Sequence, residues 1–202
     1  MALKLASIFF TMILVDNYVL SKFLGICPFL GVSKKLDSAF GMSLAVTFVM
    51  VMATAVTWPI QNFLLTPASG AWDMGYLQTI VFILVIAILV QLLENFLKKF
   101  IPALYKSLGV YLPLITTNCA ILGVTILNID NGYNFIEAIV CAAGAGIGFL
   151  LAMVLFSGVR RKVEQAVVPK CFEGLPITLV AAAMTSLSFM GFGGIVSAIF
   201  GV

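Results

Sequence analysis

The chain has 202 residues, of which 62% are hydrophobic and only 9% charged, with a formal net charge of +3. Soluble domains are about half apolar and about a quarter charged, so the composition excludes an ordinary soluble domain and indicates a membrane protein. The sequence contains no histidine, so a metal site would need cysteine or carboxylate ligands. Three of the four cysteines lie in long apolar runs, which argues against the disulfide framework of a small secreted protein.

Six apolar segments are each long enough to cross the hydrocarbon core, which takes about 20 helical residues. They cover approximately residues 3–24, 39–60, 76–97, 107–127, 134–158 and 175–199. The first resembles a signal peptide in its charge and apolar run, but it has no small-residue cleavage pattern, so we expect a retained helix. The connectors are too short for a separate soluble domain. The sequence therefore predicts an all-α integral membrane protein with six transmembrane helices in one membrane domain, residues 1–202.

Basic residues occur in only three of the five connectors between these segments. They are Lys34 and Lys35 in the first, Lys98, Lys99 and Lys106 in the third, and Arg160, Arg161, Lys162 and Lys170 in the fifth. Cytoplasmic loops are enriched in lysine and arginine. We therefore expect these three connectors to face the cytoplasm and both termini to lie outside it.

A seven-residue motif, C-x-x-L-G-V-[ST], occurs once in each half of the chain. The first copy, CPFLGVS, begins at Cys27, and the second, CAILGVT, begins at Cys119. With three spans in each half, the halves start on opposite sides of the membrane. We therefore predict two inverted three-helix repeats, about residues 1–99 and 100–202. Equivalent atoms in such repeats approach each other only near the symmetry axis, so the two cysteines would meet near mid-membrane.

Both motifs are predicted to lie on broken helices. Cys119 is about 20 Å from the cytoplasmic end of its span, at about 1.5 Å per helical residue. Cys27 is only seven residues from Lys34 and reaches that depth only if the segment after it is partly unwound. Pro28 disfavours helical geometry at Cys27, and residues 116–118 can break the second half similarly. Such breaks are tolerated where they line a cavity or are buried in protein, so we expect broken first helices in both repeats around a central site.

The residues alone leave the role of the two thiols open. They could pack as small hydrophobes, form a disulfide or bind a metal. A metal site from two cysteines is incomplete, because zinc and iron–sulfur clusters commonly take four ligands. The missing pair could come from a second chain or from Cys141 and Cys171. However, Cys171 lies in a cytoplasmic loop, so we interpret it as an incidental thiol and Cys141 as a packing residue.

Three polar residues near the motifs are candidates for an ion path or for contacts around a metal group. Ionisable groups inside a membrane are costly and by default indicate function. Lys22 could offset the charge of a thiolate-bound group, or it could snorkel or pair with a carboxylate of another chain. Asn118 could hydrogen-bond a sulfur or the broken backbone, or it could hold helices together. Asp16 could serve a cation path or a structural role in the outer half.

The small residues of the stretch 142–148 are expected to allow close approach between transmembrane helices. They do not follow a strand of a βαβ unit, so a phosphate-binding loop has almost no support. The sequence also lacks a basic aromatic surface, and we expect no nucleic-acid partner.

Three stretches resemble the A-subunit family of the Rnf electron-transport complexes. They are KFLGICPFLGVSKK from Lys22, LPLITTNCA from Leu112 and SLSFMGF from Ser186. The resemblance covers essentially the whole chain and extends to the D and E subunits of the sodium-translocating NADH:quinone reductase. It implies that two homologous six-helix subunits pack in opposite orientations and share a [2Fe–2S] cluster within the membrane. Cys27 and Cys119 would supply two ligands, and an inverted partner similar to the E subunit would supply the other two.

The same resemblance implies a membrane component of an ion-translocating ferredoxin:NAD⁺ oxidoreductase in a bacterial cytoplasmic membrane. Electron relay across the membrane would be coupled to Na⁺ or H⁺ translocation. The chain has no flavin-attachment motif and no soluble cluster motif, so flavin and further iron–sulfur carriers would belong to other subunits. The alternatives are the E subunit of the quinone reductase, a stand-alone small-solute transporter with packing cysteines, which inverted repeats also suit, and a purely structural assembly subunit.

Overall fold

The computed structural model describes residues 2–33, 36–65, 77–100, 112–166, 168–169 and 171–191, and every regular element in these ranges is helical. The elements are α1 (Ala2–Leu14), α2 (Ile26–Val32), α3 (Leu36–Ile60), the π-helix η1 (Gln61–Leu65), α4 (Gln78–Phe100), α6 (Leu112–Thr116), α7 (Cys119–Asp130), α8 (Phe135–Glu164) and α9 (Leu175–Met190). The prediction of an all-α protein is confirmed.

Three of the described helices are long and apolar enough to cross a membrane, namely Ser38–Phe63, Gln78–Asn95 and Phe135–Glu164. Shorter apolar helices occupy Lys4–Leu14, Leu114–Asp130 and Leu175–Met190. Each of the six predicted segments therefore contains an apolar helix. The part of the last predicted segment beyond residue 191 lies outside the described residues.

The first predicted segment is not one continuous helix. Helix α1 ends at Leu14, residues 15–25 form turns and irregular backbone, and α2 then begins at Ile26. The first helix is broken as expected, but the prediction that the unwound part follows Cys27 is wrong. Cys27 and Pro28 both lie in the first turn of α2. Proline is tolerated there because the first backbone N–H groups of a helix have no acceptor within the helix.

Asn17 organises the irregular segment between α1 and α2. It is 1% exposed, and its Nδ2 donates to the backbone oxygen of Gly148 on α8 at 2.8 Å. Its Oδ1 accepts from the backbone N–H groups of Val19 at 3.1 Å and Leu20 at 3.4 Å. Buried backbone N–H groups that leave a helical ladder need such partners. A single amide side chain therefore supports the break and attaches it to α8.

The second break lies where the sequence predicts it. Helix α6 ends at Thr116 and α7 begins at Cys119, so Thr117 and Asn118 interrupt the segment. Gly123 lies inside α7 and does not contribute to the break. Its missing side chain instead accommodates Leu24, because a β-carbon at Gly123 would lie 2.5 Å from Leu24 Cδ1. The irregular segment of the first half thus packs directly on α7.

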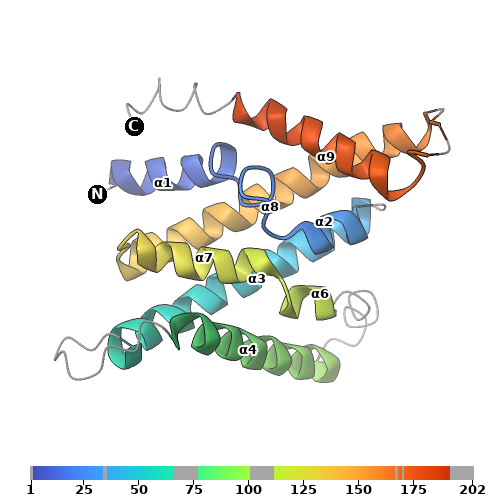
Figure 1. Ribbon diagram of the computed structural model, residues 1–202. Coiled ribbons are helices and arrows are strands. Elements are labelled where there is room, and N and C mark those ends of the chain that lie inside the picture. The colour runs from blue at the N-terminus through green and yellow to red at the C-terminus, as the bar shows by residue number, and fades with distance from the viewer. Residues whose placement is uncertain are drawn as a thin grey trace.

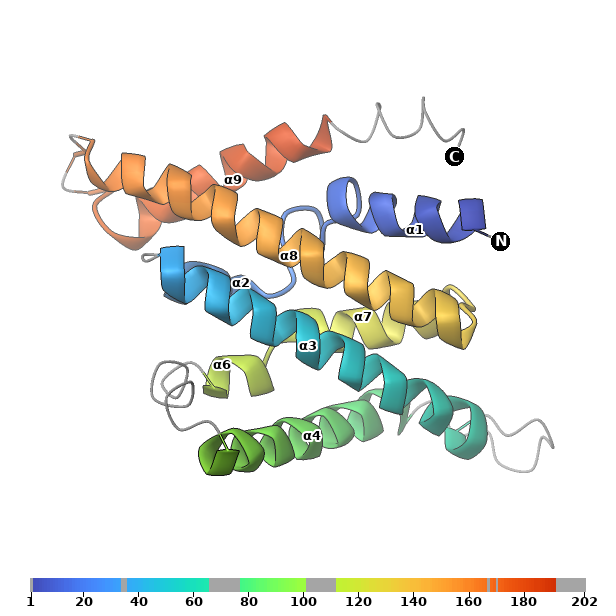
Figure 2. The same cartoon turned by 180° about the vertical axis from the view of Figure 1, so that it is seen from behind.

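Helices that hold the same place in the chain order of the two halves run in opposite directions (Figure 1). In Figure 1, α1, α2, α4 and α8 run from left to right, whereas α3, α6, α7 and α9 run from right to left. In the first half, α1 and α2 run in one direction, α3 runs back and α4 runs in the first direction again. In the second half, α6 and α7, then α8, then α9 follow the same order with every direction reversed (Figure 1). Figure 2 shows the same arrangement from behind, with the long helices α3 and α8 side by side and antiparallel.

Glycines on α8 allow the helices of the core to pack closely. A β-carbon at Gly146 would collide with the side chain of Thr47 on α3. On the other face, β-carbons at Gly144 and Gly148 would lie 3.2 Å and 3.0 Å from the backbone oxygens of Phe9 and Met12 on α1. Small residues permit this approach of backbones in membrane helices, and the prediction for residues 142–148 is confirmed.

Basic residues gather at one end of the molecule. Lys98 and Lys99 lie in the last turn of α4, and Arg161 and Lys162 lie in the last turn of α8. Both helix ends lie on the right in Figure 1. The opposite end holds the start of α1 and the start of α8, joined by an ion pair of 2.7 Å between Lys4 Nζ and Glu137 Oε1. Lys34, Lys35, Lys106 and Lys170 lie outside the described residues.

Candidate functional site

The two motif cysteines occupy the starts of two helices. Cys27 is the second residue of α2, and Cys119 is the first residue of α7. Both are exposed on the surface of this chain, whereas Cys141 is buried within α8. Cys171 is exposed in the turn between α8 and α9. Only the motif cysteines therefore combine exposure with a place on the broken helices.

The starts of α2 and α7 touch each other. Gly25 is the residue before α2, and a β-carbon there would lie 3.1 Å from Asn118 Oδ1 and 3.2 Å from Ala120 Cβ. Asn118 and Ala120 flank Cys119 in sequence, while Cys27 follows Gly25 by two residues. The fold thus brings the residue before α2 into contact with the start of α7, from sequence positions far apart. A meeting of the two cysteines themselves stays a prediction.

Only glycine suits position 25. Its φ of +84° lies in the left-handed region, where a β-carbon is strained. A side chain would also meet Phe149 of α8, because a β-carbon would lie 3.1 Å from Phe149 Cε2. Backbone conformation and crowding therefore both favour glycine at the contact between the two helix starts.

Asn118 has one satisfied and one unsatisfied polar atom. Its Oδ1 accepts from Ala120 N at 3.0 Å and so caps the start of α7. The residue is 5% exposed, and its Nδ2 has no hydrogen-bond partner among the described residues. A buried unpaired donor costs about 1–3 kcal/mol. The site therefore retains a buried N–H donor beside Cys119.

Lys22 and Asp16 lie in the irregular segment before α2. Lys22 Nζ is 3.9 Å from Asp16 Oδ1 and 5.1 Å from the centroid of the Tyr18 ring. The side chains of the pair are 32% and 40% exposed. Lys22 therefore has a carboxylate partner in its own chain. A partly exposed pair of this length contributes at most about 1 kcal/mol to stability, and roles in an ion path stay predictions.

The described residues do not form a complete metal site by themselves. No group of three or more cysteine, aspartate or glutamate side chains gathers in them to hold a metal ion. The sequence has no histidine to add. A four-ligand group at Cys27 and Cys119 would accordingly need two further ligands from outside the described residues.

Sequence reasoning missed two residues that organise this region. Asn17 supports the first break, and Arg160 of α8 hydrogen-bonds the far end of α2. In the sequence Arg160 is one of three consecutive basic residues, Arg160-Arg161-Lys162, that indicate a cytoplasmic connector. Nothing in this stretch shows that Arg160, unlike the next two residues, is buried and hydrogen-bonded. Asn17 sits beside Asp16 in an apolar segment, and its polarity at that depth is the signal that could have found it.

Comparisons with known proteins identify the family of this chain. The family model described as Rnf-Nqr subunit, membrane protein, matches residues 5–196. The A subunit of the "Na(+)-translocating ferredoxin:NAD(+) oxidoreductase complex" of Acetobacterium woodii is 56% identical over 192 residues, which are 95% of this chain and 98% of the relative. The A subunits of the "Ion-translocating oxidoreductase complex" of Syntrophotalea carbinolica and Serratia proteamaculans are 54% and 53% identical over 184 residues, 91% of this chain and 93% of each relative. The predicted resemblance is confirmed: this chain belongs to the Rnf-Nqr family of membrane proteins.

Proposed function

We propose that this chain is the A subunit of an ion-translocating ferredoxin:NAD⁺ oxidoreductase complex and holds half of a [2Fe–2S] cluster in the bacterial cytoplasmic membrane. Its relatives are named as subunits of such complexes. The observation that carries the cluster assignment is the pair of exposed motif cysteines at two touching helix starts.

The donor set fits half of an iron–sulfur site. Cysteine thiolates are the usual ligands of a [2Fe–2S] cluster, which takes four of them. The start of α7 places the positive end of a helix dipole beside Cys119, and negative charge is favoured at that end of a helix. The buried Nδ2 of Asn118 is a donor that could form a hydrogen bond to a cluster or cysteine sulfur. Exposure of both cysteines leaves room for two ligands from a homologous chain in inverted orientation.

The opposite directions of matching helices support two inverted three-helix repeats. In this arrangement the basic ends of α4 and α8 face the cytoplasm. The start of α1 then faces the outside, because Lys4 is paired with Glu137 at the other end of α8. A pseudo-two-fold axis near mid-membrane would pass close to the touching helix starts.

A bound [2Fe–2S] cluster supplies one-electron transfer. The residues of this chain would hold the two exposed thiolates at the starts of α2 and α7. Gly25, Asn118 and Phe149 close the contact between the helix starts. Flavin and further iron–sulfur carriers reside on the other subunits of the complex, and electron relay drives translocation of Na⁺ or H⁺. The name of the Acetobacterium woodii relative favours Na⁺.

Cysteine replacement in the purified complex tests the assignment. We expect Cys27→Ala and Cys119→Ala to remove the same [2Fe–2S] signal from the electron paramagnetic resonance spectrum. Each variant should also lower the iron content of the complex. Cys171→Ala is the matched control, because Cys171 is exposed but lies away from both motifs. Assembly is checked by the subunits that co-purify. Unchanged iron content and an unchanged spectrum in both motif variants would contradict the proposal.

A further inference from the structure

Arg160 makes unusual contacts for a basic residue near the end of a membrane helix. It lies on α8, is 9% exposed, and its Nη1 donates to Leu30 O at 2.5 Å. The same nitrogen donates to Ser33 Oγ at 2.7 Å. Ser33 is the residue at the end of α2. A buried charge from the second half of the chain therefore occupies the end of the helix that carries Cys27.

We propose that Arg160 is the positioning residue for Cys27, which it holds in place through the carboxyl end of α2. This inference rests on the proposed function, because its consequence is the geometry of the half-site. The neighbouring basic residue Arg161 is exposed and has no such role.

Helix α2 needs an external support of this kind. It has only seven residues, and helices this short are not stable by themselves in water. The last carbonyl groups of any helix lack partners within it. Ser33 is fully buried, so solvent cannot replace the missing donor. Hydrogen bonds from a charged guanidinium are stronger than those between neutral groups, and a cation is favoured at this end of a helix.

Other residues on α8 fix the rest of α2. Phe149 lies against Gly25 at the start of α2. Phe156 stacks on Phe29, with ring centroids 4.1 Å apart and an interplanar angle of 23°. Positions 149, 156 and 160 share one face of a helix. A stripe on α8 thus contacts α2 from the residue before it to the residue after it, and Arg160 is its polar end.

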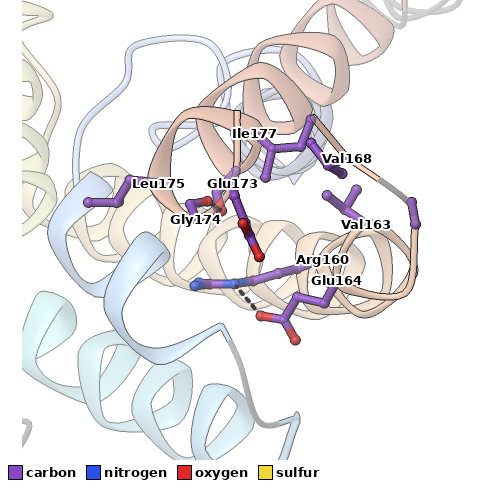
Figure 3. A pocket seen from close by; sticks show the side chains of 10 residues that line it. Arg160, Val163, Glu164, Val168, Glu173, Gly174, Leu175 and Ile177 are labelled. Atoms are coloured by element: carbon purple, nitrogen blue, oxygen red, sulfur yellow. Dashed lines mark hydrogen bonds and ion pairs between the residues drawn. The ribbon is translucent and has the colours of Figure 1, made fainter. Parts of the chain in front are cut away.

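Arg160 also borders a cavity at the basic end of the molecule. The cavity has a volume of about 460 Å³ and lies between α8 and α9. Figure 3 shows the Arg160 guanidinium beside Glu164, with the Glu173 side chain directed toward the same space. Arg160 Nε is 3.4 Å from Glu164 Oε1. Glu164 therefore orients the guanidinium from one side, while Nη1 reaches α2.

The test compares three variants of the purified complex. Arg160→Gln removes the charge and the fork of donors, Arg160→Lys keeps the charge, and Arg161→Gln is the matched control one residue further along α8. Loss of a residue that orients metal ligands typically lowers metal retention about 10–100-fold. We expect Arg160→Gln to lose the cluster about tenfold more readily under chelator challenge and to broaden its resonance spectrum. Arg160→Lys should lie between Arg160→Gln and the wild type, and Arg161→Gln should match the wild type.

If the Arg160→Gln protein fails to fold or to assemble into the complex, Ser33→Ala provides a second test of the same contact. It removes one acceptor of Nη1 without deleting a buried charge, and we expect a smaller broadening in the same direction. Wild-type spectra and wild-type iron retention in both Ser33→Ala and Arg160→Lys would overturn the inference. Absence of any [2Fe–2S] signal in the wild-type complex would instead overturn the proposed function. A wild-type signal that is unaffected by Arg160→Gln would overturn the role of Arg160 alone.

Discussion

Gly25 and Asn118 come from opposite halves of the sequence, yet a β-carbon on Gly25 would lie only 3.1 Å from Asn118 Oδ1. Each residue stands immediately before a helix that carries a motif cysteine. The contact between the two helix starts is thus made by the residues that begin them. Changes at either position should act on both cysteines.

Gly25→Ala should destabilise the protein and loosen the half-site. The left-handed conformation at φ +84° costs about 1–2 kcal/mol for a residue with a β-carbon. Crowding against Asn118 and Phe149 adds to that cost. Gly132→Ala is the control, since Gly132 also has a positive φ of 63° but a β-carbon there would meet no atom within 4 Å. Thermal unfolding and iron retention of the purified complex should fall further for Gly25→Ala, and equal losses would show that crowding at this contact is unimportant.

Asn118→Asp should separate the two functions of the asparagine. An aspartate still accepts the cap hydrogen bond of α7, but it removes the buried Nδ2 donor and adds a negative charge, whose burial costs stability. Hydrogen bonds and charge around the sulfurs set the reduction potential of a cluster, so we expect the potential to become more negative. Asn118→Ala should cost about 1 kcal/mol of stability through loss of the cap. Redox titration followed by electron paramagnetic resonance measures the potential, and an unchanged value in Asn118→Asp would argue against a donor role.

Gly146→Ala should disturb the packing of α3 against α8. The new methyl group would collide with Thr47, and overpacking of this kind typically costs about 1–3 kcal/mol. Gly158→Ala on the same helix meets no atom within 4 Å and should be neutral or slightly stabilising, because alanine favours helix over glycine by about 1 kcal/mol. Thermal stability of the two variants provides the comparison. Equal melting temperatures would contradict the close approach of the two helices.

Thiol labelling tests the orientation in the membrane. The native Cys171 is exposed between α8 and α9 and should react with a membrane-impermeant maleimide only in inverted vesicles. Asn131→Cys places a thiol at the exposed turn between α7 and α8 and should react only from the outside of intact cells. Labelling of both positions from the same side would contradict the proposed topology.

The sequence predicts a break in the first helix but places it on the wrong side of Cys27. Pro28 indicates a helix break at Cys27, yet in the first turn of α2 a proline removes an N–H group that no helical acceptor needs. The break instead depends on Asn17, whose four hydrogen bonds reach α8 as well as its own segment. Such long-range partners are not visible in local sequence, whereas the polarity of Thr117 and Asn118 indicates the second break directly.

The contacts of Arg160 were unpredictable for a related reason. A run of basic residues at the end of an apolar segment reports the side of the membrane, but it does not show which member turns inward. That choice depends on the rotation of α8, which is set by Phe149 and Phe156 against α2. Helix rotation follows from packing over the whole domain.

The exposure of Cys27 and Cys119 on this chain has a consequence for biogenesis. Under the proposed function, a newly inserted chain carries two unprotected thiols and, within its described residues, too few ligands to retain a cluster. Cluster loading would therefore follow pairing with the homologous subunit, and a chain left without its counterpart would stay redox-silent. Maturation of the metal centre would then act as a checkpoint that admits only correctly paired subunits to electron flow.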